Sequence, residues 1–248
     1  MDNQIMEVDI ACVGFGPAMG GFLTTLSRAV ADEFGETLLP SAVMPGMPMQ
    51  IVCYERADDI GFGVSGVVTQ ARAIRESFPD LKPEEIPLAA PVRQEKVYYL
   101  LDPIGASRRS SGLKIADRLL KLGKRLLPVR DDAYELPYIP PFLHKKDGMI
   151  MSVGQFAQWV GGQLMGTGLV QIWPGTPVAE PLFEGDRVIG VKLADQGVEK
   201  DGTPGPNFLP GMHIHAALTV VGDGPVGAVG QFLDRRFGFP EGNQQREW

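Results

Sequence analysis

The hydrophobic pattern near the start of the chain predicts a buried strand followed directly by a turn and a helix. Apolar residues are nearly continuous from Val8 to Val13, and several of them are β-branched. This is typical of a parallel strand that is buried on both faces. Gly14 and Gly16 follow at once, and Pro17 stands where the first turn of a helix has a spare amide and favours a fixed φ.

Similar patterns further along predict alternating helices and strands, and hence an α/β fold. We expect the first helix to run to about Phe34, with Gly35 as its stop, and a second strand at Gln50–Tyr54. A long connection rich in proline and methionine joins the two. The later expected elements are a helix at 152–164, a strand at 170–173, a turn at 184–186, a strand at 187–193, a Gly/Pro-rich loop at 200–210, a strand at 214–221 and a helix through Leu233, with the later strands forming a small β layer.

The first glycine turn has the features of a dinucleotide site. Free N–H groups and the helix dipole at a helix N-terminus both favour a pyrophosphate, and Gly14 and Gly16 leave room for it. The usual G-x-G-x-x-G pattern is broken at Met19, where a third glycine normally lets the helix pack close to the strand. A side chain there implies a wider gap, or a shift of the close contact to Gly20. A strand-turn-helix without a ligand therefore remains the alternative at this point.

Glu55 follows the second predicted strand, where a carboxylate can accept hydrogen bonds from an adenosine ribose. It comes 41 residues after Gly14, whereas about 20 residues is typical, because the connection between the two strands is long. An exposed carboxylate at the end of a strand is the alternative.

Two further glycine runs fit the same pattern. Gly61, Gly63 and Gly66 match it letter for letter but do not follow a strand, so we do not count them as a second fingerprint. The second run, Gly222–Gly227, follows an apolar strand and precedes a plausible helix, so its context is right. It indicates either a later part of the same site or a second dinucleotide site.

Composition excludes several classes of protein. The 248 residues are 44% hydrophobic with a net charge of −7, which allows a full core and argues against a nucleic-acid binder. The first ten residues are too short and too acidic a stretch for a signal peptide, and no apolar run reaches the roughly 18 residues of a membrane span. We therefore expect a cytoplasmic protein, free or on the membrane face. Cys12 and Cys53 are expected to be buried, reduced thiols. No metal-ligand spacing and no nucleophile motif is present, so no metal site and no catalytic acid, base or nucleophile is assigned.

One stretch has the opposite charge to the rest. Between Arg108 and Arg130 there are eight Lys or Arg residues and one Asp, a net charge of +7. Apolar residues recur there at helical steps, at Ile115, Leu119, Leu122 and Leu126. A basic amphipathic helix suits an anionic membrane surface or an acidic partner. The alternative is a surface helix packed on its own domain.

Several segments, taken together, resemble the electron-transfer-flavoprotein:quinone oxidoreductase family, including its FixC-like bacterial relatives. The order and spacing match over much of the chain, and ADQGVEKDG is the most particular segment. The matching segments are VDIACVGFGPAMGG at 8–21, VCYERADDIGFGVSG at 52–66, FAQWVGGQL at 156–164, VQIWPGTPVAEPLFEGDRVIGVKLADQGVEKDG at 170–202 and ALTVVGDGPVG at 217–227.

The resemblance implies a glutathione-reductase-type, Rossmann-like domain that binds FAD. It also implies a division into a first part at 1–101, a basic amphipathic insertion at 102–137 and a remainder at 138–248. The residues implied to hold FAD are Gly14, Gly16, Pro17 and Ala18 at the pyrophosphate, Glu55 at the ribose, Arg56 beside the adenosine, Val178 near the adenine, Ser65 and Gly66 toward the flavin, and Asp223, Gly224 and Gly227 in the later Asp-Gly flavin motif.

The resemblance implies a flavoprotein that passes electrons from an electron-transfer-flavoprotein-like donor to a membrane quinone. Roughly half of the family's length lies beyond the last matching segment, so we expect an N-terminal portion, or half of a split enzyme completed by a companion chain. FAD retention by this chain alone is then expected to be weak. The alternatives are an NAD(P)H-dependent flavoprotein reductase, with Gly222–Gly227 opening a second site, and a non-catalytic FAD-binding subunit.

Overall fold

The computed structural model describes residues 4–32, 39–62, 66–82, 85–86, 89–101, 108–130, 132–146, 148–225 and 227–238. The chain forms two compact units. Unit 1 consists of Met1–Val67, Ala71–Ala89 and Met151–Trp248, and unit 2 of Val68–Gln70 and Ala90–Ile150. The insertion predicted at 102–137 falls within the range of unit 2, and its status as an insertion stays a prediction.

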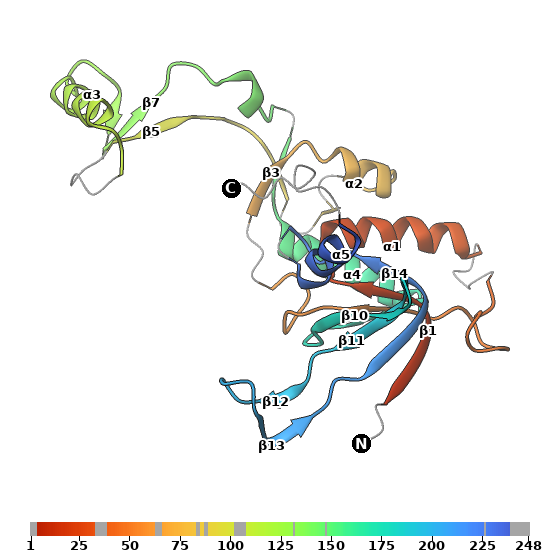
Figure 1. Ribbon diagram of the computed structural model, residues 1–248. Coiled ribbons are helices and arrows are strands. Elements are labelled where there is room, and N and C mark those ends of the chain that lie inside the picture. Colours follow the sequence, from red (N-terminus) through yellow and green to blue (C-terminus); the bar gives the residue numbers. More distant parts are fainter. Residues whose placement is uncertain are drawn as a thin grey trace. The chain divides into compact units, whose positions relative to one another are not determined.

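Unit 1 is built on a six-stranded sheet with the order β10-β11-β14-β1-β2-β9 (Figure 1). The strands β14, β1, β2 and β9 are parallel, whereas β10 and β11 extend the sheet in antiparallel pairing beyond β14. The strands that we expected as a small β layer are thus part of this sheet. The bounds are β1 Ile5–Val13, β2 Ile51–Tyr54, β9 Val170–Trp173, β10 Val178–Glu184, β11 Arg187–Leu193 and β14 His213–Val221.

The central strands owe their place to their apolar sequences. In β1, every residue from Val8 to Val13 is buried, and all four residues of β2 are buried. Cys12 of β1 and Cys53 of β2 are register partners, and both are buried free thiols, as predicted. Burial raises the pKa of the Cys12 thiol to about 12, so this thiol stays protonated at neutral pH.

Helices connect and cover the parallel strands, as a Rossmann-like α/β fold requires. The helix α1 packs against α4, α4 packs against β9, and α5 packs against β10. In the last of these contacts, the Phe183 ring lies 5.9 Å from the Phe232 ring. The bounds are α1 Pro17–Val30, α2 Arg72–Ser77, α4 Val153–Gly166 and α5 Ala228–Phe237. The α/β fold class is therefore confirmed, while the predicted helix stop at Gly35 lies outside the described residues.

The predicted loop at 200–210 is wrong. This segment contains β13, Pro204–Leu209, which pairs with β12, Gln196–Val198, in a separate two-stranded sheet. Two glycines of this hairpin serve close contact between its strands: a Cβ on Gly205 of β13 would lie 2.8 Å from the Gly197 carbonyl oxygen of β12. A Cβ on Gly197 would overlap the Asn207 carbonyl, and Gly197 has a φ of +65°. Glycine within a strand is typical where two backbones approach closely.

Unit 2 contains the helix α3, Ser111–Leu122, and a sheet with the order β5-β7-β6. A second small sheet has the order β3-β8-β4 and includes the segments where the chain passes from one unit to the other. None of the helices in the described ranges is long and apolar enough to cross a bilayer. The bounds are β3 Gly66–Thr69, β4 Ala90–Pro91, β5 Tyr98–Leu100, β6 Val129–Arg130, β7 Ala133–Glu135, the 3₁₀ helix η2 Pro141–Leu143 and β8 Met149–Ser152.

Candidate functional site

A cavity of about 280 Å³ lies in unit 1 where β1, β2 and β14 end. The carboxyl ends of parallel strands meet at one edge of a sheet, and β1 and β14 lie on either side of the point where the strand order reverses. Ligands of open α/β sheets bind at such a point. Eight of the predicted site residues line the cavity, namely Gly14, Gly16, Glu55, Arg56, Val178, Asp223, Gly224 and Gly227.

The backbone conformation and the close packing at Gly14 require a residue without a side chain. It follows the last residue of β1 with a φ of +81°, a conformation that side chains rarely adopt. A Cβ at this position would lie 2.8 Å from both the Asp223 Cα and the Gly222 carbonyl oxygen. The turn after β1 therefore passes directly against the turn after β14.

Gly16 has no such requirement from the protein. As the N-cap of α1 it has an ordinary extended backbone, with φ −109° and ψ −174°, and a Cβ there would meet no described atom within 4 Å. In the described part of the chain, no side chain caps the N-terminus of α1, and its first turn holds no acidic residue. The helix thus begins beside the cavity with free N–H donors and space in front of them, which fits an anionic group.

Glu55 ties the first turn to the end of β2. Its half-buried carboxylate accepts a hydrogen bond from the Phe15 N–H at 2.6 Å and another from the Ala57 N–H at 2.8 Å. A carboxylate has about four lone-pair sites, so roughly two acceptor positions remain for a ligand. The residue is thus a structural clamp that still has capacity for two hydroxyl groups.

Tyr54, which precedes Glu55, also lines the cavity and was not predicted. Its ring packs edge-on against Trp173, with the ring centroids 5.6 Å apart. Its hydroxyl is buried, and no described residue forms a hydrogen bond with it. The Tyr54 residue belongs to the buried apolar core of unit 1, and at 1% exposure its side chain contributes packing. Sequence patterns did not identify Tyr54 as a cavity residue, because it is simply part of an apolar strand.

The carboxylate of Asp223 serves the last helix. It accepts hydrogen bonds from the Val229 N–H at 3.0 Å and the Gly230 N–H at 3.1 Å, and so caps the N-terminus of α5. A Cβ on Gly227 would overlap this carboxylate, which explains the glycine there. The second glycine run therefore closes one side of the same cavity. The N-terminus of α5 is already occupied by a negative charge from the protein.

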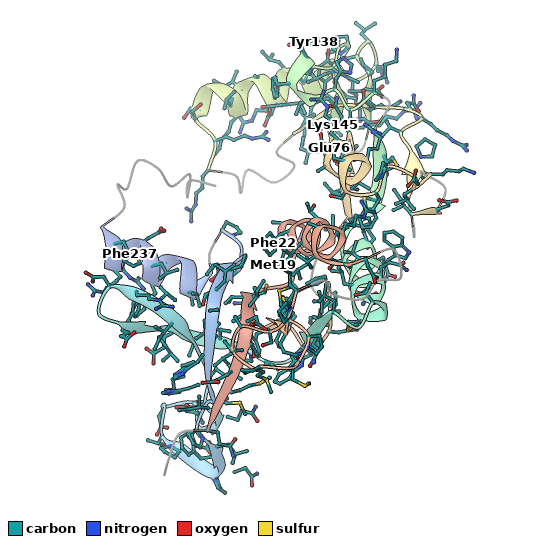
Figure 2. The ribbon with its side chains drawn as sticks, turned by 90° about the vertical axis from the view of Figure 1, so that its right-hand side faces the viewer. Met19, Phe22, Glu76, Tyr138, Lys145 and Phe237 are labelled. Atoms are coloured by element: carbon teal, nitrogen blue, oxygen red, sulfur yellow. The ribbon has the colours of Figure 1, made fainter. Side chains whose placement is uncertain are left out.

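Met19 does not fill the cavity. It is only 2% exposed, and a Cβ on Gly222 would lie 3.0 Å from the Met19 Cε, so Met19 packs under the turn after β14. Figure 2 labels Met19 and its neighbour Phe22 on α1. Gly20 instead lies close to α4, where a Cβ on Gly20 would stand 3.3 Å from the Val160 side chain. Gly222 thus leaves the space that α1 needs beside the sheet. The methionine at the third position of the glycine pattern therefore does not narrow the cavity.

The other predicted residues lie around this arrangement. Pro17 and Ala18 are the exposed first residues of α1, and Gly66 is the exposed first residue of β3. Ser65 lies outside the described residues, and so does Gly63. Gly61 and Phe62, from the glycine-rich segment at 61–66, both line the cavity, and the Phe62 side chain is exposed.

Unit 2 carries a second candidate surface, on α3. The buried residue of this helix is Asp117, which is 2% exposed and accepts hydrogen bonds from Tyr99 at 2.9 Å and Arg109 at 2.7 Å. The apolar stripe, in contrast, points outward. We call it the apolar ridge, and its members are exposed to 56% at Ile115, 63% at Leu119, 81% at Leu122 and 93% at Leu126. Helix α3 therefore turns its polar contact inward and leaves its apolar side uncovered.

The chain is similar to curated electron transfer flavoprotein-ubiquinone oxidoreductases, which confirms the predicted resemblance. A probable member from Acinetobacter baylyi is 29% identical over 242 residues, covering 96% of this chain and 35% of the relative. The Pseudomonas aeruginosa protein is 28% identical over 240 residues, covering 96% and 37%. The human mitochondrial protein is 29% identical over 239 residues, covering 96% and 32%. The chain thus spans about a third of the length of the curated relatives it matches.

Other comparisons are less specific. No protein-family model matches the chain. A geranylgeranyl bacteriochlorophyll reductase-like protein from Thermoplasma acidophilum has a TM-score of 0.49 at 13% identity, covering 96% of this chain and 43% of that chain. The THI4 protein of Thermovibrio ammonificans has a TM-score of 0.48 at 14% identity, covering 94% and 64%.

Proposed function

We propose that this chain is the N-terminal, FAD-binding portion of a flavoprotein oxidoreductase that takes electrons from an electron-transfer flavoprotein and passes them to a quinone. The observation that carries the proposal is the cavity in which Gly14, Gly16 and Glu55 meet at the carboxyl ends of β1 and β2. The names of the relatives supply the donor and the acceptor. A companion chain that completes the enzyme belongs to the same proposal.

The pyrophosphate and the ribose of FAD each have matching groups at the cavity. The free N–H groups of α1 and the space at Gly16 suit the pyrophosphate, with Pro17 and Ala18 in the first helical turn. The two remaining acceptor positions of Glu55 suit the ribose diol.

The remaining contacts are assigned by place in the cavity. Arg56 and Val178 flank the adenosine. The backbone of Asp223 and Gly224 faces the flavin side, since the Asp223 carboxylate is held by α5. We retain Ser65 and Gly66 at the flavin side and Gly227 in the Asp-Gly motif. The bound flavin would supply the redox chemistry, and the protein would orient it.

The second glycine run favours this proposal over an NAD(P)H-dependent reductase. Gly222, Gly224 and Gly227 flank the same cavity as Gly14. The carboxylate of Asp223 occupies the N-terminus of α5, where the pyrophosphate of a second dinucleotide would have to bind. Two negative groups at one helix end repel each other, so a second site there is disfavoured.

Helix α3 and the turn after it fit a role at the membrane, where quinone is dissolved. An exposed apolar ridge on a segment with a net charge of +7 suits an anionic lipid surface. We propose that the segment from Arg108 to Arg130 docks the protein peripherally on the cytoplasmic face of a membrane. A helix packed on its own domain would bury its leucines, and this one buries Asp117 instead.

A test of the proposed cofactor site is the variant Gly16→Ala. Its Cβ would meet no atom of the described residues within 4 Å and its φ needs no glycine, so the free energy of unfolding should change by less than about 1 kcal/mol. The methyl group would stand where the pyrophosphate is expected, and FAD affinity should fall at least about tenfold, which is ~1.4 kcal/mol of binding free energy. Titration followed by flavin fluorescence and denaturant unfolding give the two readings.

Two control variants make the result interpretable. Gly162→Ala adds a methyl group in α4, where a Cβ also has no described atom within 4 Å, and FAD affinity should stay unchanged. Gly14→Ala forces a positive φ onto alanine and a clash with backbone, so it should lower stability by about 1–3 kcal/mol. An unaltered FAD affinity in Gly16→Ala would count against the proposed site.

A further inference from the structure

Unit 2 contains a groove that the proposed function does not yet use. The groove has a volume of about 770 Å³ and lies between β5, β6, β7 and the turn that follows α3. Cationic residues line it together with apolar residues, namely Lys96, Lys124 and Arg130 beside Leu100, Leu127 and Val129. We call it the headgroup groove.

The charges in the headgroup groove are only partly balanced. Lys96 is paired with Glu135 at 3.0 Å, and the pair is fixed further by a hydrogen bond from Tyr98. Among the residues that the structure describes, neither Lys124 nor Arg130 forms an ion pair. Two exposed cations therefore remain in the groove for an anionic ligand.

The apolar part of the groove is exposed as well. Leu100 is 64% exposed, although it lies in β5, and Leu127 is 36% exposed. Of the last two members of the apolar ridge, Leu122 lies two residues before the groove residue Lys124 and Leu126 lies directly before the groove residue Leu127. Apolar side chains that enter a bilayer, with cations at their base, place those cations at the depth of the lipid phosphates.

We propose that the headgroup groove binds the phosphate of an anionic phospholipid through Lys124 and Arg130, with an acyl chain against Leu100 and Leu127. This inference rests on the proposed membrane docking and adds a specific site to it. A phospholipid carries an anionic phosphate and an apolar chain in one molecule, which matches both halves of the groove. An acidic peptide would leave the exposed leucines in water.

The test compares two double variants with the same loss of charge, made in the full chain. Lys124→Gln/Arg130→Gln removes the two groove cations that form no ion pair with a described residue, whereas Lys114→Gln/Arg118→Gln removes two cations of α3 that do not line the groove. The probe is dihexanoyl phosphatidylglycerol at concentrations where it is monomeric, followed by calorimetry. The wild type and the α3 double variant should bind it saturably. The groove double variant should bind it at least about tenfold more weakly, because each cation near a phosphate contributes about 1 kcal/mol.

Further ligands and vesicles define the outcomes. Dihexanoyl phosphatidylcholine and inorganic phosphate should bind at least about tenfold more weakly than phosphatidylglycerol. Equal weakening in both double variants, or displacement of the lipid by polyglutamate, would overturn the proposed groove.

Flotation with phosphatidylglycerol vesicles distinguishes a failure of the membrane docking from a failure of the groove alone. If the wild type does not bind these vesicles at all, the membrane docking itself fails. If vesicles bind and the short-chain lipid does not, only the groove fails. Equal unfolding temperatures of all variants exclude misfolding as the cause.

Discussion

Gly14 and Gly16 stand two positions apart and are glycines for different reasons. At Gly14 the positive φ and the neighbouring backbone leave no room for a side chain, so this residue fixes the turn itself. At Gly16 the backbone is ordinary and the space is open, so the absence of a side chain matters for what enters the cavity. The sequence pattern predicted both glycines as site residues. Only the structure shows that Gly14 is required by the backbone and that Gly16 is not.

Glu55 has two functions at the scale of one residue, and a substitution can test both. In Glu55→Gln the carbonyl oxygen can keep one of the two backbone hydrogen bonds, while the charge and the second bond are lost. Hydrogen bonds to charged groups contribute about 1.5–3 kcal/mol, so we expect unfolding free energy to fall by about this amount. We also expect FAD affinity to fall about tenfold or more. A variant with wild-type FAD affinity would restrict Glu55 to the clamp.

Asp9 gives a prediction about pH. This residue of β1 is only 6% exposed, and its carboxylate accepts hydrogen bonds from the backbone N–H groups of Ala42 at 2.6 Å and Gln50 at 2.8 Å. Burial alone would raise the pKa of Asp9, but these hydrogen bonds and one from Ser41 outweigh it and hold the pKa below its usual value of 3.8. The charged form is therefore favoured in the folded state.

Since the folded pKa of Asp9 is lowered, its stabilisation is present above the unfolded pKa and is lost as pH falls through the folded value. We expect Asp9→Asn to lower unfolding free energy by about 2–3 kcal/mol at pH 7. Denaturant unfolding of both proteins from neutral to acid pH should show this difference shrinking below about pH 4. A difference that does not change with pH would contradict the role of the carboxylate.

At the scale of elements, the packing of α1 on the sheet explains how the site tolerates Met19. The small residue that permits close packing is Gly222, at the end of β14, and not the third position of the turn. The sequence could not locate this compensation, because Gly222 is more than two hundred residues away from Met19.

The variant Met19→Ala tests this packing. Removal of a fully buried methionine side chain should lower unfolding free energy by about 2–5 kcal/mol. FAD affinity, measured by titration well below the unfolding temperature, should stay within about twofold of the wild type, a change below ~0.5 kcal/mol. Tighter FAD binding by Met19→Ala would indicate instead that the methionine obstructs the cavity.

Two other elements show where patterns mislead. The segment at 200–210 was predicted as a loop from its glycine and proline content, yet Gly197 and the strand Pro204–Leu209 form a hairpin in which glycine allows close contact. For α3, the periodicity gave the helix but not the direction of its apolar side. That direction depends on the contact of Asp117 with Tyr99 and Arg109, which comes from tertiary packing.

At the scale of the whole molecule, the strand order brings together residues from three distant stretches of sequence. Local patterns located β2, β9, β11 and β14 to within one residue at each end, whereas β1 begins three residues earlier than predicted, at Ile5. They could not show that the turns after β1 and β14 touch, since this depends on the pairing of the two strands. Charge is also distributed unevenly along the chain: the segment from Arg108 to Arg130 has a net charge of +7, whereas the whole chain has a net charge of −7.

The central claim is that one cavity holds the adenosine diphosphate part of FAD, and competition binding tests it most directly. The chain is titrated with FAD, followed by flavin fluorescence, in the presence of ADP or of riboflavin. Because the cavity contacts lie at the pyrophosphate and ribose, ADP should displace FAD and riboflavin should not. Absence of saturable FAD uptake, or displacement by riboflavin but not by ADP, would contradict the claim.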